Sequence, residues 1–170
     1  MIVKPLETEY NPFYQPYMNQ LHDSDVLVTL KKQLKSVPDF LWQIPKAKHD
    51  FAYAPGKWTI KELMQHINDT ERVFTYRALC FARGDRQDMP AMDQDVYLNN
   101  AAIAQRPFSS FIDEFVSLRV ATICLFENIT EDQQMNMGNA SGFPVSVRAL
   151  AAMTAGHVAH HISIINSRYL

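Results

Sequence analysis

Four of the six histidines occur at spacings that could hold a metal ion: His157, His160 and His161 near the C-terminus, and His66 in the first half of the chain. His157 and His161 are four residues apart, which places both side chains on the same face of a helix. Two imidazoles at this spacing chelate a divalent cation, and a third ligand from elsewhere completes such a site. The chemistry that these residues offer is metal binding through nitrogen.

A helical wheel over residues 147–165 separates the three C-terminal histidines. His161 falls inside the apolar arc, His157 lies on its flank, and His160 falls toward the margin, while His66 shares a side with apolar residues of its own helix. A buried imidazole without a partner costs about 1–3 kcal/mol. Three inward-facing histidines therefore favour a shared cation, and hydrogen-bonded core histidines are the alternative.

Three neutral imidazoles leave coordination positions open to water or substrate, which is typical of a catalytic rather than a structural metal site. No Glu follows His157, so the pair is not a zinc-protease motif. The remaining histidines, His22 and His49, are expected on the surface. No catalytic acid or base can be assigned from the sequence.

Three carboxylates are candidate general bases by residue type alone. Asp69 and Glu71 lie in the expected helix 59–83, and Asp85 follows it. Their positions favour roles on a helix surface or at a cap. They are therefore weaker candidates than the histidines.

Four helices must position these side chains, because apolar residues recur at three- and four-residue spacing in four segments. The expected helices begin at Ser24 or Asp25, at Thr59, at Ser109 or Ser110, and at Ser146. Thr59 and Glu62 form a capping box, and Gly84 is expected to end that helix near Arg83. Pro38 predicts a kink or an early stop in the first helix.

The segments between the helices are expected to be irregular, since no useful strand alternation occurs. Residues 1–23 predict an extended N-terminal arm. Residues 85–107 predict a long polar loop with short helical turns after Asp93 and Asn99. The loop is longer than a minimal bundle requires, which suggests that it covers part of the bundle. A small-residue face around Gly156 would admit another helix, from the bundle or from a second subunit. We expect an all-α four-helix bundle in a single domain spanning residues 1–170.

Composition excludes several classes of function. The 170 residues contain 16 Lys and Arg against 18 Asp and Glu, a net charge of −2, so no basic excess is present to bind nucleic acid. No apolar run approaches the roughly 20 residues that span a bilayer, and the N-terminus has no signal-peptide core. Two cysteines do not make a disulfide framework. These features predict a cytoplasmic protein that binds neither membrane nor nucleic acid.

The histidine-bearing segments resemble one known family. The resemblance lies in residues 57–72, 76–79 and 83–85, in Gly156–His161, and in Arg168–Leu170. These segments are similar to the DinB-like, or YfiT-like, metalloenzymes of the bacterial damage-inducible superfamily, from about residue 24 onward. The resemblance implies a four-helix bundle that forms homodimers and binds a divalent metal through His66, His157 and His161.

The resemblance also implies chemistry for the site. The metal would be zinc or nickel, with iron or manganese as alternatives, and a low-molecular-weight thiol would serve as co-substrate in a transferase that acts on a small electrophile. A hydrolase that uses activated water, and a metal- or ligand-binding protein of the stress response without enzymatic activity, are the alternatives. Many family members carry Gln three residues after the second histidine of the pair, where this chain has Ile164.

Overall fold

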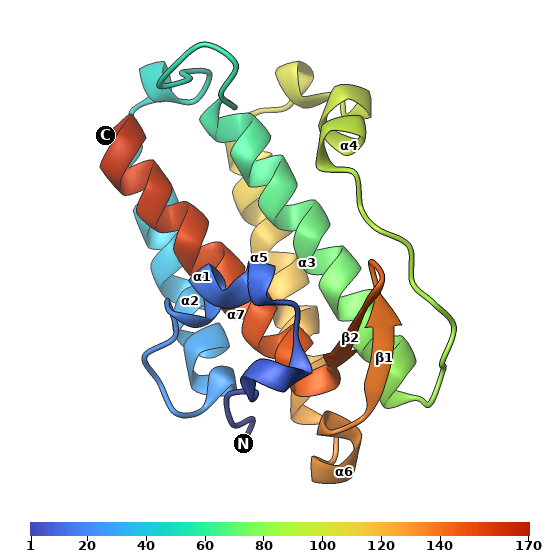
Figure 1. Ribbon diagram of the computed structural model, residues 1–170. Helices are drawn as coiled ribbons and strands as arrows, with labels where there is room; N and C mark the ends of the chain where they lie inside the picture. Colours follow the sequence, from blue (N-terminus) through green and yellow to red (C-terminus); the bar gives the residue numbers. More distant parts are fainter.

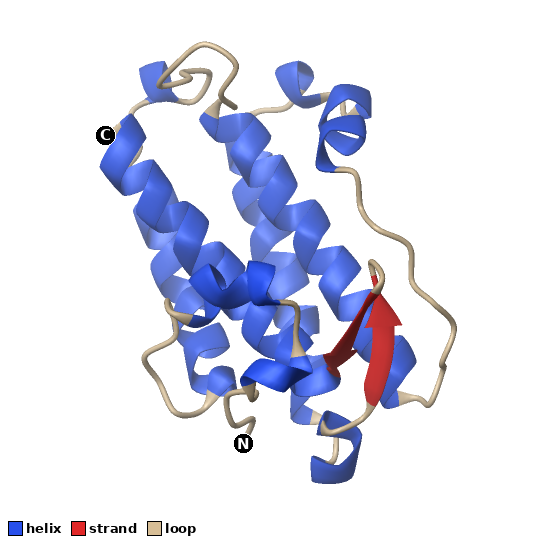
Figure 2. Ribbon diagram, in the orientation of Figure 1, coloured by secondary structure: helices blue, strands red, loops and turns tan.

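The computed structural model describes residues 1–170 and is built mainly of helices (Figures 1 and 2). The four long helices are α2 (Val26–Leu41), α3 (Ile60–Ala82), α5 (Phe108–Glu127) and α7 (Val147–Ile164). Short elements fill the connections, and one small sheet lies at the lower end of α3. The expected bundle of four helices is confirmed.

The helices follow an order around the bundle that differs from the order in the chain. Helix α3 contacts α7 and α5, and α2 contacts the same two helices. Consecutive helices α2 and α3 therefore occupy opposite corners. Helices α3 and α5 run in one direction and α2 and α7 in the other (Figure 1). Such an order requires long crossover connections in place of short hairpin loops.

The expected helix starts are confirmed at three of four positions. The side chains of Asp25, Thr59 and Ser146 accept backbone N–H groups at the N-termini of α2, α3 and α7. Helix α5 begins slightly earlier than expected, at Phe108. Pro38 lies inside α2 and the helix continues to Leu41, so it does not stop the helix early.

The connection between α3 and α5 returns along the side of α3, because these two helices are parallel (Figure 1). It contains α4 (Gln94–Asn100), which Asp93 caps, and a 3-10 turn, Ile103–Gln105. The helical turn expected after Asp93 is therefore present, whereas Asn99 lies inside α4 and the second turn begins only at Ile103. The length of the segment is explained by the distance that it must travel back to the start of α5.

A β-hairpin corrects the expectation that the chain has no strands. Strands β1 (Met137–Ala140) and β2 (Phe143–Ser146) pair antiparallel, after the short helix α6 (Glu131–Gln134). The two turn residues, Ser141 and Gly142, have positive φ values of 57° and 81°, the conformation that tight hairpin turns require. Strands of four residues are too short to show a recognisable alternation of polar and apolar residues.

The N-terminal arm is folded rather than extended, which corrects the second expectation. It forms 3-10 turns at Glu7–Glu9 and Pro12–Tyr14 and then helix α1 (Gln15–Met18). Helix α1 crosses α7 at Gly156, where a Cβ atom would lie 2.3 Å from the carbonyl oxygen of Tyr17. The small-residue face of α7 therefore receives the arm of the same chain.

The interior consists of two hydrophobic clusters with buried polar residues between them. One cluster surrounds Phe81 and Phe126 at the lower end, and the other surrounds Ile67 and Phe111 at the upper end. A short π-helical turn, Ile165–Tyr169, follows α7. The buried polar residues between the clusters include the histidines described next.

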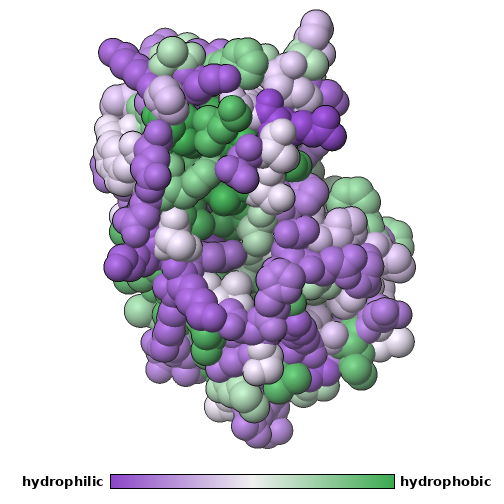
Figure 3. Space-filling view, turned by 90° about the vertical axis from the view of Figure 1, so that its left-hand side faces the viewer, coloured by the Kyte–Doolittle hydropathy of each residue, from purple (hydrophilic) through white to green (hydrophobic).

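The outer face over α2 and α7 mixes hydrophilic and hydrophobic residues, and its largest hydrophobic area lies in the upper half (Figure 3). None of the helices combines the length and the apolarity that crossing a membrane would require.

Candidate metal centre

Helix α3 is oriented at its start by a complete capping box. The Thr59 hydroxyl accepts the N–H of Glu62 at 3.2 Å, and the Glu62 carboxylate accepts the N–H of Thr59 at 2.6 Å. Two free backbone donors are thereby satisfied reciprocally. The helix then continues without interruption to Ala82, where Gly84, with a φ of 83°, turns the chain away. The register of every side chain along α3 follows from this fixed start.

The structure brings His66 of α3 together with His157 and His161 of α7. The ring centroids lie 4.9 Å apart for His66 and His157, 5.1 Å for His66 and His161, and 4.4 Å for the α7 pair. One ring nitrogen from each residue lies within 4.8 Å of the other two. We call these three residues the histidine cluster. They are the residues that the helical wheel selected.

The histidine cluster is buried, and three of its six ring nitrogens are buried without a hydrogen-bond partner. The exposed fractions of His66, His157 and His161 are 7%, 2% and 9%. The Nε2 atoms of His66 and His157 face each other at 2.9 Å, while Nδ1 of His66 and both ring nitrogens of His161 make no hydrogen bond. Buried polar atoms without partners are uncommon in proteins and call for a ligand that satisfies them.

Burial also keeps the three imidazoles neutral. It lowers the pKa of His66 to about 4. Burial, together with the neighbouring imidazoles, lowers the pKa of His161 to about 3 and that of His157 well below its usual range. A neutral imidazole presents a lone pair, which is the form that binds a cation. The donor set of three nitrogens therefore fits a divalent transition metal.

Aromatic side chains hold the rings of the histidine cluster in place. Trp58 packs against His66 with ring centroids 4.9 Å apart, and Tyr17 of α1 meets His157 edge to face at 5.3 Å. The hydroxyl of Tyr169 donates to the carbonyl of Trp58 at 2.6 Å. The N-terminal arm and the C-terminal turn thus both contribute to the surroundings of the site.

Two cavities reach the histidine cluster from different sides. A cavity of about 400 Å³ opens onto His66 and His157, between α1 and the segment 91–94. A second, of about 310 Å³, opens onto His161 beside Trp58 and Ile164. Ile164 is one of the residues that line this second cavity, so its wall is apolar at that point. Segment 85–107 covers part of the site, as expected, and leaves room above it.

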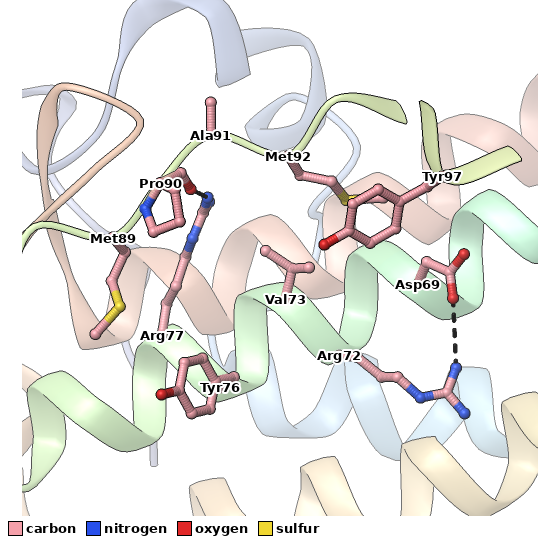
Figure 4. Close-up of a pocket in the computed structure, with 10 residues that line it drawn as sticks. All are labelled: Asp69, Arg72, Val73, Tyr76, Arg77, Met89, Pro90, Ala91, Met92 and Tyr97. Carbon is pink, nitrogen blue, oxygen red and sulfur yellow. Dashed lines mark hydrogen bonds and ion pairs between the residues drawn. The ribbon is translucent and has the colours of Figure 1, made fainter. Parts of the chain in front are cut away.

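The three carboxylates considered as general bases do not join the histidine cluster. Glu71 is bound by Arg119 and Thr122 in the bundle core. Asp69 lies in a neighbouring cavity on α3, drawn in Figure 4, where burial raises its pKa. Asp85 lies beyond the end of α3 and accepts the N–H of Gln87. None of them is placed to exchange a proton at the cluster.

The other histidines lie outside the cluster. His160 is half-buried and its ring lies beside Tyr17, at a centroid distance of 5.2 Å. His22 is exposed as expected, but His49 is half-buried, because it stacks on Phe108 at 3.9 Å. That stacking corrects the expectation of a solvated surface residue.

Sequence reasoning missed several residues that line the larger cavity. Tyr14 and Tyr17 come from the arm, Ser141 comes from the hairpin turn, and Arg77 lies on α3. The mid-helix Gly156 was a signal that a neighbouring backbone approaches α7, but it did not identify that neighbour. Arg77 belongs to a motif that supported the family resemblance, yet its type and spacing alone gave it no role.

Comparisons with known proteins agree with this arrangement. A family model, described as the DinB superfamily, matches residues 29–165. No curated protein sequence matches the chain. YfiT from Bacillus subtilis, described as a probable metal-dependent hydrolase with an unusual four-helix bundle topology, superposes with a TM-score of 0.72 at 16% identity. That match covers 96% of this chain and 89% of YfiT.

A second solved structure is the mycothiol-dependent maleylpyruvate isomerase, with a TM-score of 0.66 and 12% identity. The match covers 85% of this chain and 61% of the isomerase, so this chain spans less than two thirds of that protein. At these identities both similarities concern the fold alone. The family match over residues 29–165 shows that the chain belongs to the DinB superfamily.

Proposed function

We propose that His66, His157 and His161 bind one divalent metal ion and that the protein is a metal-dependent enzyme acting on a small molecule. The observation that carries this proposal is that one ring nitrogen from each of three buried histidines lies within 4.8 Å of the other two. Three ring nitrogens of His66 and His161 also have no hydrogen-bond partner in the chain. Imidazole suits zinc, nickel and iron, whereas manganese prefers oxygen ligands. We therefore expect zinc or nickel, with iron next and manganese last.

The reaction that the two cavities support best is transfer of a thiol to a small electrophile. A divalent cation bound here would lower the pKa of a thiol and polarise an electrophile. One reactant has room in the cavity at His66 and His157, and the other in the cavity at His161. The mycothiol-dependent isomerase with this fold also uses a thiol, which supports the assignment.

The chain's own residues prepare the larger cavity for such a reaction. Aromatic side chains from the arm line this cavity, and burial raises the pKa values of Tyr14 and Tyr17. Both phenols therefore stay protonated near neutral pH and can donate hydrogen bonds to a bound molecule. Neither hydroxyl is engaged by another residue of the chain.

Metal analysis tests the metal site. Protein purified without a nickel column should contain close to one equivalent of a divalent transition metal. The His157→Ala variant should lose it, while His160→Ala, a neighbouring histidine outside the cluster, should retain it. Equal metal content in both variants would contradict the proposal.

Hydrolysis is the second candidate, because the site leaves room for water and YfiT is described as a probable hydrolase. The two reactions differ in whether a reactive electrophile is consumed only when a thiol is added. Turnover without thiol would favour the hydrolase. A metal-binding stress protein without activity is disfavoured by the open cavity of about 400 Å³, which segment 85–107 does not fill.

We further infer that residues 1–170 form one domain, that two copies associate, and that the protein works in the cytoplasm, with the bacterial stress response as its expected setting. Light scattering tests the association. A particle of twice the chain mass of 19.5 kDa supports a dimer, and a particle of 19.5 kDa contradicts it.

A further inference from the structure

Arg77 is a buried cation that no carboxylate neutralises. Its side chain is 4% exposed and extends from α3 to the segment Met89–Met92 (Figure 4). Its Nη2 atom donates to the carbonyl of Pro90 and, at 3.2 Å, to the hydroxyl of Ser141. Nε and Nη1 make no hydrogen bond, so the group retains free donors.

The other arginines that the fold buries or half-buries differ from Arg77 in this respect. Each pairs with a carboxylate: Arg119 with Glu71, Arg148 with Glu9, and Arg106 with Glu114. Burying a cation costs several kcal/mol unless it is paired, and a guanidinium does not lose its proton to avoid that cost. Holding two neutral acceptors does not require a charge. The positive charge of Arg77 therefore points to an anion that the chain itself does not supply.

Arg77 lines the cavity of the histidine cluster as well as the neighbouring cavity drawn in Figure 4. Helix α3 places His66, Thr70 and Arg77 within about 40° of one another on one face, over three turns or about 16 Å. All three line the cavity of about 400 Å³. The hydroxyl of Thr70 is buried and has no hydrogen-bond partner. A molecule lying along this face would meet the imidazoles at one end and the guanidinium at the other.

The charges around this cavity favour an anion at the Arg77 end. Arg77 is the only Lys or Arg that lines it, and Asp93 is the only carboxylate. Asp93 is occupied at the start of α4, where it accepts the N–H groups of Asp95 and Val96. Asp93 makes no ion pair with Arg77, so it does not substitute for an external anion.

We propose that the molecule bound in this cavity carries an anionic group, a carboxylate or a phosphate, that Arg77 binds through its free N–H donors. The hydroxyl of Thr70 bonds to the same molecule between its anionic end and its reactive end. A guanidinium matches the two oxygens of either group with parallel hydrogen bonds. Only the placement of the reactive end at the histidines rests on the proposed function.

A titration with small anions tests the anion site. Succinate, acetate and inorganic phosphate are added separately to the full-length protein, metal-free and zinc-loaded, and binding is followed by the NMR shifts of the amide and arginine Nε–H groups. We expect saturable binding of at least one anion, with shifts at Arg77 and Thr70. Tighter succinate binding identifies a carboxylate, and tighter phosphate binding identifies a phosphate.

Two substitutions that each remove one positive charge from α3 are compared for their effect on anion binding. Arg77→Gln should weaken binding by about tenfold or more, the factor expected for lost hydrogen bonds to a charged group. Arg72→Gln, on the same helix but with its side chain 47% exposed and paired with Glu114, should change it by less than about twofold. Absence of saturable binding in the wild type, or equal weakening by both substitutions, would overturn the inference.

If circular dichroism shows that Arg77→Gln does not fold, a third variant tests the anion site. Thr70→Val keeps the shape of the side chain and should weaken binding by a few-fold, and unchanged affinity would count against the inference. Zinc uptake is measured in parallel. Zinc bound without any anion binding refutes the anion site alone, while anion binding without zinc uptake refutes only the metal site.

Discussion

Two polar clusters are buried along α3, and they differ in how completely the chain satisfies them. In the first, both carboxylate oxygens of Glu71 accept N–H groups of Arg119, at 2.9 and 2.8 Å, and Thr122 and Gln33 complete the hydrogen bonds. In the second, the histidine cluster, three ring nitrogens have no partner. Both are buried, with no member more than 9% exposed. We call the first a closed cluster, because its polar groups are hydrogen-bonded to one another, and such a cluster holds helices together. We call the histidine cluster open, because some of its polar atoms have no partner and it borders cavities. An open cluster is arranged to bind a ligand from outside the chain.

Among single substitutions, the largest effect is expected in the closed cluster. Arg119→Met leaves Glu71 as an unpaired buried carboxylate, which should lower the free energy of unfolding by about 3–5 kcal/mol. Urea denaturation measures it. Arg72→Met, which removes an exposed ion pair, should cost no more than about 1 kcal/mol. A loss below about 1 kcal/mol for Arg119→Met would show that the closed cluster does not stabilise the bundle.

At the histidine cluster, the free energy of unfolding should depend on whether a metal ion is bound. Zinc at a hundredfold excess over its dissociation constant should raise the free energy of unfolding by about 2.7 kcal/mol, since the ion binds only the folded chain. Thermal unfolding with and without zinc checks this expectation. The His157→Ala variant should show no such gain. The same gain in that variant would place the zinc elsewhere.

Acid should destabilise the metal-free protein through the open cluster. The pKa of His66 falls from 6.5 to about 4 on folding and that of His161 to about 3, so the unfolded chain binds protons more readily. Stability is therefore full above pH 6.5 and declines as the pH falls toward 4, by on the order of 2 kcal/mol per histidine at pH 5.

Urea denaturation at a series of pH values measures that decline. A His22→Gln variant, which changes an exposed histidine, should show the same pH dependence as the wild type. Stability that stays constant between pH 7 and pH 5 would mean that the three imidazoles are not buried in neutral form.

The smallest effect is expected at the helix start that orients His66. Thr59→Ala removes a capping box and should cost about 1 kcal/mol. Zinc affinity should change little, because the cap lies about two turns from His66. Thr130→Ala, which removes the capping box of the four-residue helix α6, is the matched control and should cost less. A large loss of zinc affinity in Thr59→Ala would tie the metal site to the cap.

The sequence was informative where local periodicity decides the structure. The period of an α-helix fixes which side chains share a face, so His157 and His161 could be placed together and His160 apart. Caps are equally local, which explains why Thr59, Ser146 and the turn at Gly84 were predicted. Metal-ligand spacing and family resemblance then selected the same three histidines.

Features that depend on distant contacts could not be predicted in the same way. The diagonal order of the helices arises from how whole faces pack. The hairpin strands of four residues carry too little pattern to be recognised. Gly156 indicated a close neighbour, but only the fold shows that Tyr17 fills that place. Arg77 became a candidate anion-binding residue only once the fold showed that no carboxylate pairs with it.

The central claim is that the histidine cluster binds one divalent ion. A crystal of protein purified without a nickel column, measured at the absorption edges of zinc, nickel and iron, tests it most directly. We predict one anomalous peak among the rings of His66, His157 and His161, about 2.0–2.1 Å from one nitrogen of each if the ion is zinc. Absence of a peak after zinc addition, with the ring nitrogens bonded to water and to one another, would contradict the claim.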